Sequence, residues 1–178
     1  MKIFVSSLIS ALALTALTGC TEKVPTKYID GKVIGCSDIK IDGNTGLQVP
    51  CLGDATLINL ESLRGPMLLN VWGSWCAPCQ DEIPYLRHFN DKYKGKVQIV
   101  GLDVEEPNKN APKSFIKSNG ITWPILFDPD GRTRKLIGMG VPVTWFIDET
   151  GKVIYKKVGV FTDYKELEQS AKKYFNLN

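Results

Sequence analysis

The segment that most constrains the fold is an apolar run followed closely by two cysteines. Residues 67–72 read MLLNVW, a nearly continuous apolar run that is typical of a strand buried on both faces of a sheet. Cys76 and Cys79 follow as a Cys-x-x-Cys pair, and apolar residues then recur every three or four positions through 78–93. This spacing predicts a helix. The two cysteines therefore stand at the junction between a buried strand and a helix.

This placement favours redox chemistry at the cysteine pair. Cys76 falls at the expected helix N-cap, where unpaired N–H groups and the helix dipole stabilise a thiolate and lower its pKa from about 8.5 into a range of roughly 3.5–7.5. Cys79 lies one turn inward and can close a disulfide with Cys76, which releases a partner held as a mixed disulfide. A zinc site would require two such pairs, but Cys36 and Cys51 are 15 residues apart. We therefore expect no metal and no organic cofactor.

The rest of the pattern alternates strands with helices. Strands are predicted at 46–50, 97–104, 123–127, 143–147 and 152–158, and helices at 60–63, 112–119, 133–137 and 163–175. Such alternation indicates an α/β layer fold, and 178 residues correspond to one domain. With 43% apolar residues the chain is not largely disordered. A net charge of +3 without a basic stripe gives no reason to expect a nucleic-acid partner.

The N-terminal residues indicate export. Lys2 precedes an apolar run over 3–17, and fifteen helical residues span about 22 Å, less than the ~30 Å hydrocarbon core of a membrane. Residues 17–20, LTGC, resemble a bacterial lipobox, in which the cysteine is lipidated and cleavage precedes it. We expect a lipoprotein signal peptide at 1–19, lipidation of Cys20, and an extracytoplasmic protein anchored by lipid to the cell membrane. An ordinary signal peptide with a chance cysteine is the alternative.

The remaining cysteines are interpreted as a structural pair. Disulfides persist outside the cytosol, and a bond between Cys36 and Cys51 would close a loop of about 15 residues, worth roughly 3 kcal/mol. We expect a staple that fixes the N-terminal part of the domain. A second redox pair, or two free thiols, are the alternatives.

A family resemblance rests on these same residues. Residues 71–79, VWGSWCAPC, resemble the active-site segment of the thioredoxin superfamily, and the chain from about Gly53 to its C terminus is similar to the membrane-tethered TlpA/ResA-like thiol-disulfide oxidoreductases. The similarity includes Glu82, the turn at 128–131, GVPVT at 140–144 and the hairpin at 146–151. The N-terminal cysteine pair is similar to that of secreted actinobacterial members.

The resemblance implies a domain organisation. It predicts a tether at 20–35 and a thioredoxin-like domain at 36–178, with a three-layer fold whose central mixed sheet is flanked by helices. Residues 36–65 would form an N-terminal extension stapled by the Cys36–Cys51 disulfide.

The resemblance also implies how substrates dock. It predicts a cis peptide at Val141–Pro142, packed beside the cysteines, and a docking surface that these two residues share with Trp75 and Pro78. Trp75 adjoins Cys76 in the sequence and would offer an apolar contact to a substrate.

The site departs from thioredoxins proper at one position. Those proteins carry a buried Asp six residues before the first cysteine, whereas this chain has Asn70, which cannot take a proton. Glu82, three residues after Cys79 and therefore on nearly the same helix face, is the candidate for proton transfer. The alternative is a solvated acid in the first turn of the helix.

These observations predict a protein thiol-disulfide oxidoreductase with Cys76, Cys79 and Glu82 as its catalytic residues. The resemblance favours a reductant of partner proteins, as in cytochrome c maturation. A disulfide-forming oxidase of secreted proteins is the main alternative, and a peroxiredoxin-like peroxidase and a non-catalytic binding module are two others. The expected partners are proteins with thiols or disulfides, together with a membrane redox partner that supplies or removes electrons.

Overall fold

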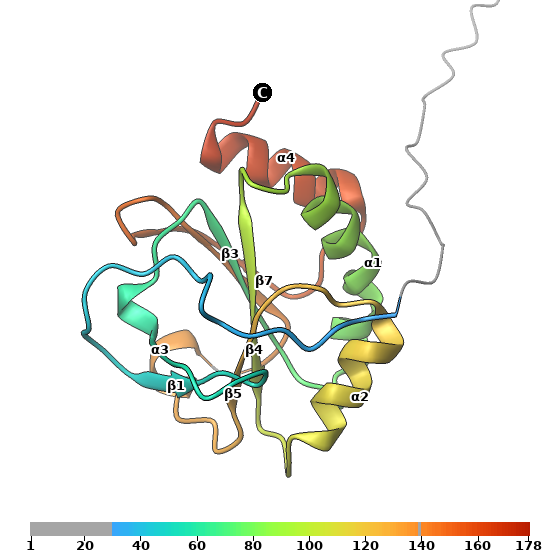
Figure 1. Ribbon diagram of the computed structural model, residues 1–178. Helices are drawn as coiled ribbons and strands as arrows, with labels where there is room; N and C mark the ends of the chain where they lie inside the picture. Colours follow the sequence, from blue (N-terminus) through green and yellow to red (C-terminus); the bar gives the residue numbers. More distant parts are fainter. Residues whose placement is uncertain (1–29, 139) are drawn as a thin grey trace, which may run out of the picture.

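The centre of the molecule is a five-stranded mixed sheet (Figure 1), in a computed structural model that describes residues 30–138 and 140–178. Its strand order is β5-β4-β3-β6-β7. Strands β3, β4 and β5 are parallel, while β6 is antiparallel to β3 and β7 is antiparallel to β6. The strands are β3 (Met67–Trp72), β4 (Gln98–Val104), β5 (Ile125–Asp128), β6 (Val143–Ile147) and β7 (Val153–Val158). The predicted α/β layer fold is confirmed, and β3 is its central strand.

Three helices cover one face of this sheet, two of them on the right in Figure 1 and the third across the top. They are α1 (Ala77–Lys92), α2 (Asn110–Asn119) and α4 (Tyr164–Phe175). Alternate residues of the strands, such as Leu68 and Trp72, pack with the apolar faces of these helices in one core cluster. The alternation follows from the strand period of two, which directs successive side chains to opposite faces.

The opposite face is covered by the N-terminal extension and by one short helix. The extension contributes the hairpin β1 (Gln48–Pro50) and β2 (Leu57–Asn59) and the 3-10 turn η1 (Leu60–Ser62), and α3 (Arg134–Ile137) lies on the same side. Val49, Ile58 and Ile137 pack there with Leu69 and Val100 of the sheet in a second core cluster. The three-layer arrangement is therefore confirmed. The strand at β2 was not predicted, because three residues carry too little periodicity.

The extension is stapled and joined to the edge of the sheet. Cys36 and Cys51 form a disulfide with their Cα atoms 5.9 Å apart, as expected. The N–H of Leu52 donates a 2.8 Å hydrogen bond to the carbonyl of Ile125, and Cys51 forms an isolated bridge with Leu126. These contacts cover β5, which is an edge strand of the main sheet. Covering an edge removes a template for unwanted strand pairing.

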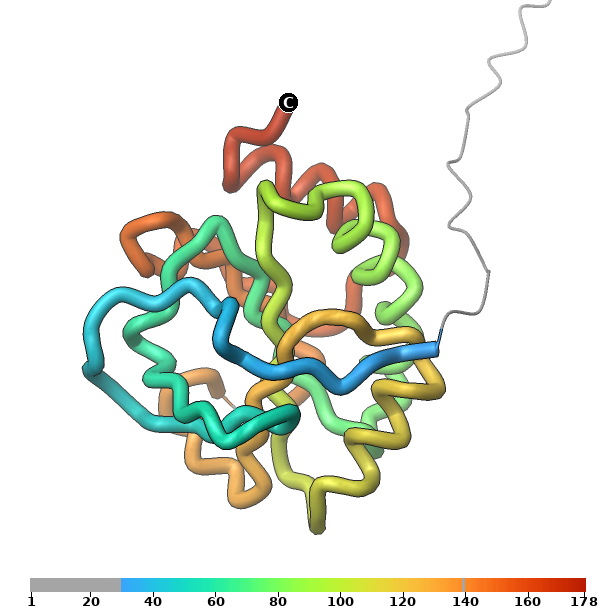
Figure 2. The backbone as a smooth tube through the Cα atoms, viewed as in Figure 1, coloured from blue at the N-terminus to red at the C-terminus, as the bar shows by residue number. Residues whose placement is uncertain are grey.

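The described chain begins on the helical side and crosses the sheet toward the extension (Figure 2). Gly31 and Lys32 donate main-chain hydrogen bonds to the carbonyls of Lys117 and Ile121. The part of the expected tether that the structure describes, residues 30–35, therefore contacts the domain. The signal peptide at 1–19 and the lipidation of Cys20 lie outside the described residues. Within the described ranges, none of the helices has both the length and the apolar character needed to span a bilayer.

Candidate active site

The site is built where the central strand ends and α1 begins. All six residues of β3 are buried between β4 and β6, so the loop that follows starts from a fixed point. Cys76 is the N-cap of α1 and has extended backbone angles. Its Sγ accepts a 3.2 Å hydrogen bond from the N–H of Cys79, which is the usual role of an N-cap side chain. Pro78 stands in the first turn, where its missing N–H costs nothing.

The two cysteines are joined by a disulfide, and their Cα atoms lie 5.3 Å apart. Cys76 is 5% exposed and Cys79 is completely buried. The sulfur of a partner molecule can therefore reach Cys76 from solvent, whereas it cannot reach the buried Cys79. The sequence prediction that this pair can form a disulfide is confirmed by the geometry.

Glu82 lies one helical turn beyond Cys79 and is completely buried. Its Oε1 accepts a 2.8 Å hydrogen bond from the side-chain amide of Asn70, and its Oε2 accepts one of 3.2 Å from the N–H of Phe161. Burial raises the pKa of Glu82 to about 7, although these two hydrogen bonds act in the opposite direction. The alternative of a solvated first-turn acid is therefore wrong. Asp81, next to it, is the exposed one.

Asn70 ties Glu82 to the centre of the sheet. Its Nδ2 also donates a 3.0 Å hydrogen bond to Oγ1 of Thr144 on β6, so one amide group joins β3, α1 and β6. Both acceptors are buried. An amide carries no titratable proton, and this residue therefore orients Glu82 without competing for its proton.

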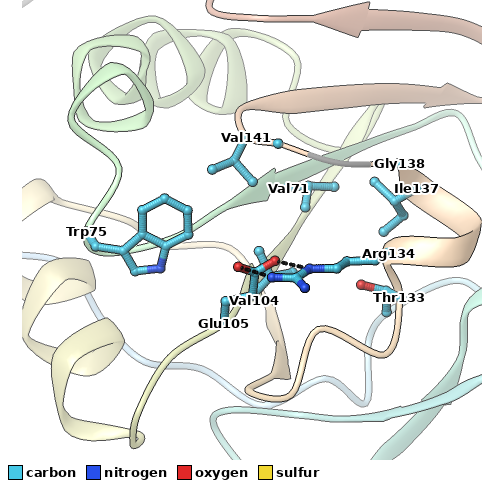
Figure 3. A pocket seen from close by; sticks show the side chains of 10 residues that line it. Val71, Trp75, Val104, Glu105, Thr133, Arg134, Ile137, Gly138 and Val141 are labelled. Atoms are coloured by element: carbon cyan, nitrogen blue, oxygen red, sulfur yellow. Dashed lines mark hydrogen bonds and ion pairs between the residues drawn. The ribbon is translucent and has the colours of Figure 1, made fainter.

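The Val141–Pro142 peptide is cis, as the family resemblance implied. The carbonyl of Pro142 accepts a 2.9 Å hydrogen bond from the N–H of Gly159, which fixes this loop to the end of β7. Val141 lines a groove together with Trp75, and Figure 3 shows the two side chains on the same side of it. Trp75 is 55% exposed. Two of the four docking residues predicted from the sequence, Trp75 and Val141, therefore line the same groove.

The local sequence explains the position of Trp75. A Cβ atom at Gly73 would lie 2.6 Å from the Trp75 indole, closer than non-bonded atoms approach. Glycine at 73 therefore leaves the space in which the indole packs against its own loop. This placement keeps a large apolar surface in solvent beside Cys76.

The residues on the opposite side of this groove were not predicted from the sequence. Arg134 of α3 forms a bidentate ion pair with Glu105, with both N–O distances at 2.6 Å, and Figure 3 shows this pair across the groove from Trp75. Ile137 lies beside it. Arg134 and Glu105 are 29 positions apart in the chain, so no local pattern connects them.

Two buried acidic residues at the end of β4 were also not predicted from the sequence. Asp103 is completely buried and Glu106 is 4% exposed. Glu106 Oε1 accepts a 2.6 Å hydrogen bond from the N–H of Ser74, in the loop that carries Cys76. One signal for Asp103 was present in the sequence, because it interrupts the apolar strand at 97–104 with a charge.

The second disulfide lies elsewhere. Cys36 and Cys51 pack in the core cluster opposite the helices, whereas Cys76 and Cys79 pack in the cluster beneath α1. Among the described residues, Cys36, Cys51 and Asp54 are the one group of potential metal ligands within reach of each other. Both sulfurs are bonded to each other, and Asp54 accepts hydrogen bonds from the N–H groups of Cys36 and Thr56. Their ligand atoms are therefore already engaged.

Comparison with known proteins agrees with this geometry. A family model described as Redoxin matches residues 44–172, most of the chain. The chain belongs to the Redoxin family. Within it, the thiol-disulfide oxidoreductase ResA of Bacillus thuringiensis is 37% identical over 119 residues, which cover 65% of this chain and 68% of ResA. The predicted enzyme class, a protein thiol-disulfide oxidoreductase, is confirmed at this level.

Solved structures in the same group have the same fold. StoA from Bacillus subtilis is 26% identical with a TM-score of 0.56, and the match covers 69% of this chain and 93% of StoA. A DsbF homologue from Corynebacterium diphtheriae is 28% identical with a TM-score of 0.57, and the match covers 71% of this chain and 83% of that one. The thioredoxin-like fold expected for this Redoxin-family chain is therefore confirmed.

Proposed function

We propose that this protein is an extracytoplasmic reductant of disulfides in partner proteins, with Cys76 as the nucleophile, Cys79 as the resolving cysteine and Glu82 as the proton acceptor. The observation that carries the proposal is the arrangement at the start of α1. A slightly exposed N-cap sulfur is bonded to a buried one, and a buried carboxyl with a pKa of about 7 follows one turn later. This combination supplies a nucleophile, a resolving group and a base near neutral pH.

The reaction proceeds by two sulfur exchanges. In the reduced protein, the Cys76 thiolate attacks one sulfur of a substrate disulfide, and the other substrate sulfur leaves as a thiolate that takes a proton. The Cys79 thiol loses its proton and attacks Sγ of Cys76, which releases the second substrate sulfur. The substrate gains two electrons and two protons, and the protein is left with the Cys76–Cys79 disulfide.

Glu82 is placed to take the Cys79 proton. Residues at i and i+3 of a helix are neighbours on its surface, and both Cys79 and Glu82 are completely buried. Water does not reach Cys79 directly, so an internal base is needed. Near pH 7 a substantial fraction of Glu82 is ionised and able to accept.

The groove beside Cys76 serves as the docking surface. Trp75 and Val141 offer apolar contacts, Pro78 shapes the exposed first turn, and the cis Pro142 peptide presents main-chain groups to an extended substrate strand. Similarity to ResA supports a reducing role, with the haem-site cysteines of apocytochrome c, joined as a disulfide, as one substrate class. A membrane redox partner would return electrons to Cys76 and Cys79, and lipidation at Cys20 would hold the protein at that membrane.

The experiment that tests the direction is the reduction potential of the Cys76/Cys79 pair, measured against glutathione and dithiothreitol. A reductant is expected to lie below about −250 mV, and a value near −120 mV would instead support the disulfide-forming oxidase. A Cys36→Ser/Cys51→Ser variant is the matched control, because it removes the other disulfide and should keep the same potential.

A second experiment tests the residue roles. Cys79→Ser should accumulate mixed disulfides between Cys76 and its partners, whereas Cys76→Ser should accumulate none. Full activity of Cys76→Ser would support a non-catalytic binding module. Peroxide turnover by Cys79→Ser would support a peroxiredoxin-like peroxidase.

A further inference from the structure

A second buried acid lies at the same end of the sheet as the cysteines. Asp103 is near the end of β4, paired in register with Trp72 of β3 on one side and Phe127 of β5 on the other. It is completely buried. Side chains at 99, 101 and 103 share one face of β4, and Ile99 belongs to the core cluster beneath the helices. Asp103 therefore points to the same side of the sheet as α1.

Asp103 is buried without a hydrogen-bond donor from the described part of the protein. Neither of its carboxylate oxygens receives a hydrogen bond from a protein donor, although unpaired buried charges are costly. Glu106 is the neighbouring acid that, after burial, raises the pKa of Asp103, through its charge and through side-chain hydrogen bonding. Two ionised carboxylates have no hydrogen to share. A hydrogen bond between them therefore requires that one carboxyl keeps its proton.

Glu106 connects this pair to the redox loop. Its Oε1 accepts the N–H of Ser74 at 2.6 Å, two residues before Cys76. A hydrogen bond from an N–H donor stabilises the ionised form of a carboxyl. Glu106 receives one from Ser74, whereas no protein donor among the described residues reaches Asp103, so Asp103 is the member that carries the proton. Glu106 therefore stands between Asp103 on the sheet and Ser74 in the loop that carries Cys76.

We propose that Asp103 is a positioning residue of the redox site: it donates its proton in a hydrogen bond to Glu106, and this acid pair holds the Ser74 N–H and with it the loop that presents Cys76. The assignment goes beyond the proposed function in naming a second acid that touches neither substrate nor sulfur. Its consequence for Cys76 rests on the proposed function, whereas its consequence for Ser74 does not.

The protonation state follows from the surroundings of Asp103. Burial, the charge of Glu106 and hydrogen bonding with Glu106 raise the pKa of Asp103 to about 9. The register partners of Asp103 in the neighbouring strands, Trp72 and Phe127, carry no charge, and the ammonium of Lys109, the N-cap of α2, lies 5.7 Å from the Phe127 ring centroid. On α1, Glu82 is bound instead to Asn70 and Phe161. The pair therefore keeps its proton at neutral pH and loses it under alkaline conditions, when two like charges face each other.

The direct test is the Ser74 amide resonance, followed by NMR between pH 6 and 10.5 in the oxidised protein. The thiols cannot titrate in this form, and no substrate is needed. We expect the wild-type resonance to titrate with a midpoint near 9, and the titration to vanish in Asp103→Asn, whose amide can donate to Glu106 at every pH. Glu82→Gln is the matched control, and it should keep the alkaline titration of Ser74. A Ser74 resonance that does not titrate, or that titrates equally in Asp103→Asn, overturns the proposal.

A second measurement follows the effect on Cys76. In the reduced protein, the alkylation rate of Cys76 at pH 6 reports how well the N-cap stabilises its thiolate. Asp103→Leu removes the donor and should slow this alkylation several-fold, while Asp103→Asn should recover most of the loss. Equal rates in Asp103→Leu and wild type contradict the positioning role. If the protein exchanges no disulfides at all, the proposed function fails while the Ser74 titration still stands.

Discussion

The side-chain amide of Asn70 donates a 2.8 Å hydrogen bond to Oε1 of Glu82, and both residues are buried. Asn70 belongs to the central strand and Glu82 to the helix that carries the cysteines. The contact therefore fixes the orientation of the proposed base and lowers its pKa, against the larger effect of burial, which raises it.

Replacing Glu82 by Gln should slow the resolving step at neutral pH. The Gln oxygen can still accept from Asn70 and Phe161, so the fold is kept while the proton acceptor is lost. We expect a decrease of about 100-fold or more in the rate of disulfide exchange, together with loss of the inflection near pH 7. Asp81→Asn, an exposed neighbour, is the control and should leave the profile unchanged. A normal pH profile in Glu82→Gln would remove this residue from the reaction.

Asn70→Asp should raise the pKa of Glu82 above its value of about 7. The substitution places a second carboxyl within hydrogen-bond distance of Glu82, and like charges disfavour the ionised form. The midpoint of the pH–rate profile should move upward by about one unit or more. Thr144→Val serves as the control, because it removes the other acceptor of Asn70 without adding charge. A downward movement of the midpoint would contradict the role given to Asn70.

Stability should fall as pH rises between about 4 and 9 because of Asp103. Its pKa is raised from an ordinary 3.8 to about 9 in the folded chain. Above pH 4 the unfolded chain therefore releases a proton that the native protein keeps. Ionisation favours unfolding in this window, with a slope that approaches about 1.4 kcal/mol per pH unit. Denaturant titrations should show a smaller decrease for Asp103→Asn. Parallel curves for the two proteins would mean that Asp103 is ionised in the native state.

Removing the Cys36–Cys51 disulfide should cost stability without changing the redox pair. The bond closes a loop with a sequence separation of 15, and its loss in Cys36→Ser/Cys51→Ser should reduce the free energy of unfolding by roughly 3 kcal/mol. The denaturant midpoint measures this loss. The reduction potential of Cys76/Cys79 should stay the same. A changed potential or a slower exchange rate would instead indicate that the second disulfide relays electrons.

Most elements of the fold were predictable because their signals are local. The apolar run of β3, the cysteine pair and the helical spacing of α1 lie within about 25 consecutive residues, and each strand or helix is recognised by its own period. The hairpin strand β2 was not predicted, because three residues are too few to show the alternation of apolar and polar side chains that indicates a strand. The boundaries of β5 differ slightly because Trp123 and Pro124 extend the apolar pattern but precede Ile125, the first residue of the strand that is paired in register with β4.

Local patterns along the chain were enough to place a dithiol pair at a helix N-terminus, since strand, N-cap and helix are consecutive. It also indicated Glu82, which is a fixed number of residues from Cys79 on one helix. The packing of the folded chain was needed to show that Glu82 is buried against Asn70, and that Glu106 accepts a hydrogen bond from Ser74, 32 positions away in the chain. These contacts depend on which strands lie side by side in the sheet. Burial, and with it the raised pKa values of Glu82 and Asp103, exists only once those strands and helices have packed.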